Sequence, residues 1–335
     1  MGSMTNDGMK IDRWSAHWSQ RRVLLRFASG ASTAAIALSP EAAKELGTQL
    51  HQAVQTFENE HGTLWCEQHR LHGQRTDRCM DGARLLNGDS DARRVYQLIR
   101  NLPLTGFERS FKMRQGQLDS GRFLVGFPVK AMADADIDYL ASQLGAPLAY
   151  RAAIAATLAQ ANFVHVGFEP GDGQRICKMY LEFPEPQAAG QPLYIGYKWD
   201  LEETQQQAVS HYVPTTMPGK LALVDPEACA SLQDILGLAT ERVLLSALRY
   251  VEVTDQDTQR MSFDINLYPA GLRMRDLRPM LAALQHHFSI PDKAMTALME
   301  HMADDVVGHV SAGTDRHGRA FVTVYHARPE ALAPA

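Results

Sequence analysis

The chain has 335 residues, of which 45% are hydrophobic and 21% are charged, and its formal net charge at pH 7 is −5. This composition is typical of a globular protein with a sizeable core and excludes an intrinsically disordered chain. The acidic balance argues against nucleic acid or an anionic membrane as a bulk partner, although a local basic cavity remains compatible with it.

No run approaches the roughly 20 apolar residues that cross a bilayer, and we find no signal peptide. Four scattered cysteines (Cys66, Cys79, Cys177 and Cys229) are too few for a disulfide framework and fit the reducing cytoplasm. Residues 1–20 are polar and predict a flexible N-terminus that opens with the tag-like remnant Met-Gly-Ser. We expect residues 21–328 to form a single domain.

The first elements are a strand at Arg22–Ala28 and a helix that starts at Ser39-Pro40-Glu41, with Ser as N-cap and Pro at the first helical position. Between them and the next helix, Cys66-x-x-His69-x-x-His72 with Cys79 is a candidate zinc site. Structural zinc sites pair ligand doublets across a longer loop, so this crowded spacing argues against zinc.

The middle and end of the chain alternate between strands and helices. The expected strands are a pair within Glu108–Val129, a strand at Leu193–Asp200 and a return strand near His211–Pro214. The expected helices are Asp89–Arg100, Ala133–Leu144, Ala149–Ala161, a helix from Asp225-Pro226-Glu227 to about Leu238, Met274–Phe288 and Pro291–Asp304.

The stretch Arg175–Phe183 has the clearest strand pattern in the chain. Met179, Leu181 and Phe183 alternate with Lys178, Tyr180 and Glu182, which is the period of a strand with one apolar and one polar face. A polar face of this kind can simply lie in water. The pattern recurs, however, in three hairpins that end in tyrosine, and repetition of this kind favours a repetitive architecture. The hairpins are His165–Tyr180, Leu244–Tyr268 and His309–Tyr325.

Strands that come as tight hairpins must pair antiparallel, and helices on one face only favour closure of the sheet. We therefore predict an α+β fold: a closed barrel of about ten antiparallel strands inside a ring of helices, built from repeated strand-pair and helix-pair units. The apolar faces point to the helices. The polar faces then line a lumen with Lys112, Arg114, Arg122, Lys178, Tyr180, Lys198, Asn266, Tyr268 and Tyr325.

Such a lumen has a recognisable chemistry. Cations inside a low-dielectric wall bind anions, and arginine and lysine suit phosphate oxygens. Tyrosine donates a hydrogen bond and presents a π face to a cation. Together they would stabilise a pyrophosphate leaving group and shield the carbocation that it leaves behind.

Five segments resemble the ABBA aromatic prenyltransferases, which have the PT-barrel fold, and are most similar to the dimethylallyltryptophan synthase branch. The segments are Gly106-Phe107-Glu108-Arg109-Ser110, Gly121-Arg122-Phe123, Lys178-Met179-Tyr180, Asn266-Leu267-Tyr268-Pro269 and the hairpin ending in Tyr325. The resemblance implies that Glu108 is the catalytic group that accepts the proton of the aromatic substrate. It also implies substrate binding by Arg122, Lys178, Tyr180, Lys198, Asn266, Tyr268 and Tyr325.

The family's Arg-x-Lys-x-Tyr strand does not appear in its usual form. By order along the chain, its nearest counterpart is Tyr194–Lys198, which supplies a single lysine. If Arg260–Tyr268 is the counterpart instead, Asp264 and Asn266 replace both cations. These two alignments stay open at this point.

The expected activity is transfer of a prenyl group, dimethylallyl above all, from its diphosphate to an indole, a phenol or a peptide that carries such a ring, in a monomer or homodimer. No cofactor is expected to be required, and magnesium is optional. The acidic run Asp134-x-Asp136-x-Asp138 lacks the Asp-Asp-x-x-Asp spacing and sits at a helix start, where Asp is favoured. The alternatives are a non-catalytic barrel that binds an anionic or aromatic molecule, and an enzyme of another type.

Overall fold

The computed structural model describes residues 13–19, 22–29, 32–39, 41–46, 48–49, 90–100, 102–171, 174–203, 207–215, 224–256 and 258–328. The chain divides into two compact units, Met1–Phe57 and Glu58–Ala335. The candidate zinc ligands Cys66, His69, His72 and Cys79 lie outside the described residues. No helix in the described ranges is long and apolar enough to cross a membrane.

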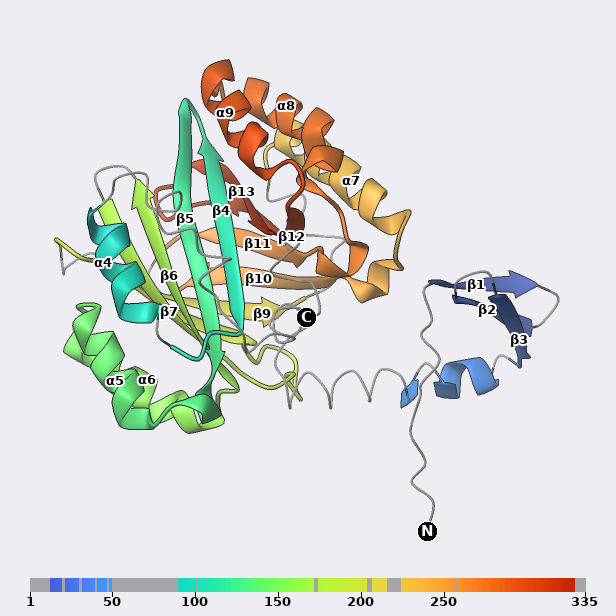
Figure 1. Cartoon of the computed structure of the whole chain (residues 1–335), viewed down its shortest axis with the longest axis horizontal. Helices are drawn as coiled ribbons and strands as arrows, with labels where there is room; N and C mark the ends of the chain where they lie inside the picture. The colour runs from blue at the N-terminus through green and yellow to red at the C-terminus, as the bar shows by residue number, and fades with distance from the viewer. Residues whose placement is uncertain are drawn as a thin grey trace, which may run out of the picture. The chain divides into compact units, whose positions relative to one another are not determined.

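The first unit holds a three-stranded antiparallel sheet, β1 (Arg13–Ser19), β2 (Arg22–Ser29) and β3 (Ser32–Leu38), in that order (Figure 1). Strand β1 falls in the stretch expected to be a flexible N-terminus, and the division into compact units comes after Phe57. The sequence of β1 alternates Trp, Ala and Trp with polar residues, which is the period of a strand. After the sheet, Ser39 Oγ accepts a hydrogen bond from the N–H of Ala42 at 3.1 Å, as expected for an N-cap.

The second unit is a closed barrel, as the sequence predicts (Figure 1). Its described strands are β4 (Gly106–Arg114), β5 (Gln117–Pro128), β6 (Phe163–Gly171), β7 (Gln174–Glu182), β8 (Tyr194–Asp200), β9 (Gln207–Pro214), β10 (Arg249–Asp255), β11 (Met261–Asn266), β12 (Val306–Thr314) and β13 (Ala320–Ala327). Each strand pairs antiparallel with the next along the chain, and β13 pairs with β4 to close the ring. Because the barrel is closed and has no open edge, every strand has one face toward the lumen and one face toward the outside.

Helices cover the outer face of this barrel. They are α4 (Ser90–Ile99), α5 (Asp134–Gln143), α6 (Leu148–Thr157), α7 (Pro226–Thr240), α8 (Arg278–His287) and α9 (Asp292–Met302). Short 3-10 turns are η2 (Val129–Ala131), η3 (Leu158–Gln160), η6 (Leu245–Ala247), η7 (Tyr268–Ala270) and η8 (Met274–Leu277). In Figure 1, α4, α5 and α6 lie along one side of the barrel and α7, α8 and α9 along another.

The expected regular repeat of helix pairs is wrong in part. The pair α5 and α6 separates β5 from β6, and the pair α8 and α9 separates β11 from β12. Residues 183–193, between β7 and β8, form no helix. That connection is only 11 residues long and contains three prolines (Pro184, Pro186 and Pro192), which interrupt helices, so it has no room for a helix pair. The helix starts agree better: Asp225 caps α7 through a 3.0 Å bond from the N–H of Glu227.

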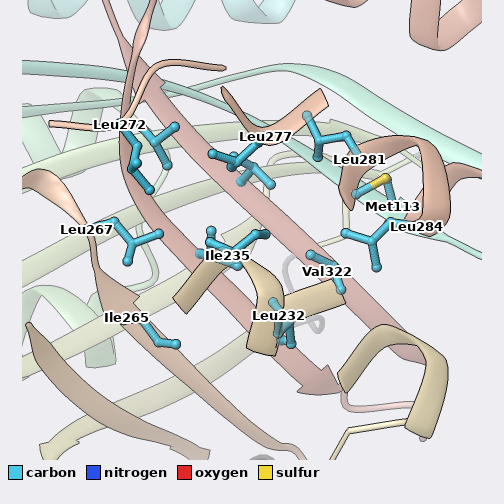
Figure 2. Packing of buried hydrophobic residues seen from close by; sticks show 14 of the residues in the cluster. Met113, Leu232, Ile235, Ile265, Leu267, Leu272, Leu277, Leu281, Leu284 and Val322 are labelled. Atoms are coloured by element: carbon cyan, nitrogen blue, oxygen red, sulfur yellow. The ribbon is translucent and has the colours of Figure 1, made fainter. Parts of the chain in front are cut away.

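Two apolar cores fill the space between barrel and helices. In one, α4, α5 and α6 pack on the outer faces of β5 to β8, where Met179 and Leu181 are fully buried. In the other, α7 and α8 pack on β4 and β11 to β13, and Figure 2 shows Ile235 of α7 among these side chains. Because the apolar residues of each strand are used outside the barrel, their polar neighbours in sequence must face the lumen.

Truncation of Ile235 to alanine should destabilise this second core. Ile235 is 1% exposed and belongs to the cluster in Figure 2. We expect Ile235→Ala to lower the free energy of unfolding by about 2–5 kcal/mol, the range for a large-to-small change in a core. Urea unfolding followed by circular dichroism measures it. Leu244, which is 60% exposed, supplies the control, and its change to alanine should stay within about 0.5 kcal/mol.

Candidate active site

One end of the lumen is crowded with cations, and we call it the cation compartment. The lysines and arginines that line it are Lys112, Arg114, Arg122, Lys178, Lys198, Arg260, Arg316 and Arg319. The carboxylates among its lining residues are Asp119, Glu169 and Asp315. Eight cations therefore face three carboxylates, in a chain whose overall charge is negative.

A bulge in β5 brings two of these charged residues to the same face. Ser110 pairs with Arg122 while Lys112 pairs with Asp119, so β5 has an extra residue between the two pairs. Gly121 takes a φ of 79° there, a left-handed conformation that glycine adopts without strain. The bulge reverses the alternation, and Asp119 and Arg122 both line the cation compartment although they are three residues apart.

Burial and mutual repulsion act on the lysines of this compartment. The pKa of Lys178 is held well below its usual value, first by burial and then by Arg122 and Arg260. Burial likewise lowers the pKa of Lys112 and of Lys198, again with neighbouring arginines adding to the effect. An anion that enters the compartment stabilises the protonated form of these lysines, because it offsets both the lost hydration and the repulsion.

Glu169 supplies one anion among these cations. It lines the compartment from β6, and its Oε1 pairs with Arg122 Nη2 and with Lys178 Nζ. No sequence motif singled out Glu169, although the alternation from His165 through Gly167 in β6 places it on the inner face. One internal carboxylate thus bridges two of the cations that we expect to bind substrate.

Lys198 is held by a polar relay on the neighbouring strands. Its Nζ donates to Ser210 Oγ at 2.6 Å, and Ser210 in turn donates to Asp255. Arg260 lies 3.6 Å from Asp255 through Nη1 and donates through Nε to Ser262 Oγ at 3.0 Å. Each of the two segments considered as counterparts of the Arg-x-Lys-x-Tyr strand places a cation in the lumen. Strand β8 contributes Lys198, and the segment leading into β11 contributes Arg260.

A second pocket shares part of this lining, and we call it the tyrosine compartment. Its lining includes Tyr180, Tyr194, Tyr212 and Tyr325 together with Leu124 and Val251. Arg122, Glu169, Lys178, Tyr212 and Tyr325 line both compartments, so the two are parts of one lumen.

The tyrosine rings contact one another, and a glycine leaves the space that one of them occupies. Tyr212 meets Tyr180 and Tyr194 edge to face, with ring centroids 5.7 and 5.9 Å apart. A Cβ on Gly196, opposite Tyr180 in β8, would come within 2.6 Å of that ring. Burial raises the pKa of Tyr180 and of Tyr212, so their hydroxyls stay protonated and the rings stay neutral.

Glu108 lines the tyrosine compartment from β4 and is 2% exposed. Its Oε1 accepts a 2.7 Å hydrogen bond from the hydroxyl of Tyr268. A buried carboxylate beside an aromatic pocket is suited to accept a proton from a ring held there.

Asn266 and Tyr268 line neither compartment, which corrects the expected lumen. Strand β11 ends at Asn266, and Leu267 then adopts φ −106° and ψ 0°, so strand alternation no longer applies to Tyr268. Asn266 Oδ1 accepts the backbone N–H of Tyr268 at 3.0 Å. Tyr268 contacts Glu108, and Asn266 holds the backbone of Tyr268. The residues Arg122, Lys178, Tyr180, Lys198 and Tyr325 line the lumen as the sequence predicts.

The space for the Tyr268–Glu108 contact depends on Gly308 in β12. An added Cβ there would lie 2.5 Å from Glu108 Oε1 and 2.7 Å from Tyr268 Oη. We expect Gly308→Ala to displace both side chains and to lower the free energy of unfolding by about 1–3 kcal/mol, the cost of overpacking a filled core. Urea unfolding followed by circular dichroism measures it. Gly237→Ala in α7, where nothing lies within 4 Å, is the control and should not lower the stability.

The described part of the chain contains no group of three or more His, Cys, Asp or Glu side chains that could hold a metal ion. Asp134 and Asp136 lie in the first turn of α5, as expected, and Asp138 pairs with Arg151 at 2.6 Å. The acidic run therefore serves the helix and its neighbour.

Comparisons with known proteins give a match in structure only. No protein-family model matches the sequence, and no curated protein does. Among solved structures, the chain is similar to NotF prenyltransferase, with a TM-score of 0.42 and 12% identity over 66% of this chain and 81% of that one. It is also similar to AnaPT from Neosartorya fischeri (TM-score 0.35, 13% identity, 66% and 78% covered) and to NotF in complex with brevianamide F and DMSPP (TM-score 0.40, 14% identity, 66% and 79% covered).

Proposed function

We propose that the protein transfers a prenyl group, dimethylallyl above all, from its diphosphate to an electron-rich aromatic ring such as an indole or a phenol. One observation carries the proposal: a single lumen contains a cation compartment, a set of neutral tyrosine rings and a buried carboxylate. Each part answers one need of the reaction, namely a diphosphate, an allylic cation and a ring proton.

In the first step the allylic C–O bond breaks and its electron pair leaves with pyrophosphate. Arg122, Lys178 and Lys198 are the side chains that would neutralise the leaving group, as charge-assisted hydrogen-bond donors. The carbocation then lies against Tyr180, Tyr212 and Tyr325, whose rings attract a cation and exclude water.

In the second step a carbon of the aromatic acceptor attacks the cation and forms the new C–C bond. The ring regains aromaticity when it loses a proton, and Glu108 is the base that takes it. The Tyr268 hydroxyl donates a hydrogen bond to Glu108 Oε1 and so helps to hold the carboxylate in the tyrosine compartment. The products are the prenylated ring, pyrophosphate and a protonated Glu108.

The direct test is incubation of the pure protein with dimethylallyl diphosphate and a panel of indoles, phenols and short peptides that contain Trp or Tyr. We expect pyrophosphate release coupled to a mass gain of one isoprenyl unit in an acceptor. Tight binding of the diphosphate with no turnover across the panel would instead favour the non-catalytic binding barrel.

Turnover should not depend on a metal ion. Eight lysines and arginines line the cation compartment, so they can neutralise a diphosphate without magnesium. We expect rates in excess EDTA to stay within about 2-fold of those in magnesium, since charge neutralisation is already supplied by the protein. Complete loss of turnover in chelator, restored by added magnesium, would contradict a site made of side-chain cations alone.

The free cysteines Cys177 and Cys229 lead us to propose a cytoplasmic location.

A further inference from the structure

His309 is a charged group in the lumen that has no role in the proposed reaction as described above. It follows Gly308 in β12, and it lines the tyrosine compartment with Glu108 and Asp264. Its Nδ1 lies 2.6 Å from Asp264 Oδ1, and its Nε2 lies 4.0 Å from Glu108 Oε1. One imidazole thus stands between two carboxylates, of which only Asp264 is hydrogen-bonded to it at short range.

The surroundings fix both the orientation and the charge of this ring. Tyr268 and Tyr325 meet it edge to face, with ring centroids 5.8 and 6.0 Å away. Burial acts to lower the pKa of His309, but Asp264 and Glu108 outweigh burial and raise the pKa to about 9. His309 is therefore an imidazolium at neutral pH, with Nδ1–H donating to Asp264 and Nε2–H directed toward Glu108.

We propose that His309, held by Asp264, is a positioning residue that keeps Glu108 ionised and ready to accept the ring proton. This inference rests on the proposed function and adds to it. A base is useful only while it is unprotonated, and an imidazolium about 4 Å away favours the carboxylate form. Because His309 is already protonated and Asp264 compensates its charge, the ring proton stays on Glu108 and does not pass to the imidazole.

The groups around His309 come from every neighbouring strand. Asp264 belongs to β11, Glu108 to β4 and Tyr325 to β13, while Tyr268 reaches in from η7. Glu182 of β7 adds a weaker attraction for the proton of His309. Asp264 is itself held, because Ser311 Oγ donates to its Oδ2. Arg122 of β5 and Lys178 of β7 line the same compartment, but the named groups that act on the proton of His309 are the three carboxylates, and they raise its pKa.

The first arm of the test needs no turnover. We expect the ring of His309, followed by NMR of the full chain with 15N-labelled histidine, to titrate near pH 9. Asp264→Asn should lower that midpoint by about 1–3 pH units, and Glu108→Gln should lower it by a smaller amount. A midpoint near 6.5 in the unaltered protein, or one that neither substitution moves, overturns the inference even if the protein is an active prenyltransferase.

The second arm of the test follows the ionisation of Glu108 through the pH dependence of kcat/KM. In His309→Gln the acid limb of kcat/KM against pH should move up by about 1–3 pH units, because Glu108 loses the nearby positive charge. Binding of inorganic pyrophosphate should stay within about 2-fold, since His309 does not line the cation compartment. An active His309→Gln enzyme with an unshifted acid limb overturns the inference while leaving the proposed function in place.

A matched control exists on the outer face of the same barrel. His326 Nδ1 lies 2.6 Å from Asp305 Oδ2, the same pairing at the same distance, and both residues are buried. Asp305→Asn should leave the acid limb where it is, because neither residue faces the tyrosine compartment. If no acceptor is ever prenylated, the proposed function fails, and the NMR arm still decides whether His309 and Glu108 are coupled.

Discussion

Glu108→Gln is expected to reduce turnover by about 100- to 10,000-fold, the range for removal of a general base. Glutamine keeps the shape of the side chain and the oxygen that accepts the Tyr268 hydroxyl, so the pocket should not collapse. It cannot take the ring proton. Steady-state rates with dimethylallyl diphosphate and a reactive acceptor measure the loss.

Affinity for pyrophosphate should change little in this variant, because Glu108 lines the tyrosine compartment and not the cation compartment. Titration calorimetry gives that control on the same sample. Loss of pyrophosphate binding together with turnover would show that Glu108 supports the fold of the whole lumen. Unchanged turnover would remove Glu108 from the mechanism and leave proton loss to water or to another group.

How much of this site could be predicted follows from where strand alternation holds. In β7 the outward burial of Met179 and Leu181 forces Lys178 and Tyr180 into the lumen, so a sequence pattern was enough. The same rule failed at Tyr268 because the chain leaves β11 two residues earlier.

Other features depend on which strands become neighbours in the sheet. Glu169 of β6 meets Arg122 of β5 and Lys178 of β7 through the pairing of β6 with both strands. Likewise, His309 and Asp264 are 45 residues apart and meet through the pairing of β12 with β11. Their residue types alone do not distinguish them from surface charges, since a charged residue in a strand is ordinarily solvated. The β5 bulge at Gly121 has no signal in the alternation pattern either, because it interrupts that pattern.

Two substitutions in the cation compartment should shift affinity in opposite directions. Lys178→Met removes a buried ammonium that lines both compartments, and it should weaken pyrophosphate binding by about 10- to 150-fold. That range corresponds to about 1.5–3 kcal/mol for a hydrogen bond to a charged group. Titration calorimetry with inorganic pyrophosphate measures it without turnover, and Arg242→Ala, whose guanidinium pairs with Asp276 at 2.8 Å, is the control.

Glu169→Gln should strengthen the same binding, by about 10-fold. In the free protein the Glu169 carboxylate pairs with Arg122 and Lys178, the cations that a diphosphate needs. An incoming anion must therefore displace a charge-assisted contact before it gains one of its own, and glutamine, which carries no charge, lowers that cost. Weaker binding in Glu169→Gln would mean that the carboxylate orients the two cations for the ligand. Stronger binding that disappears in the Glu169→Gln, Lys178→Met double variant would show that Lys178 is the cation released.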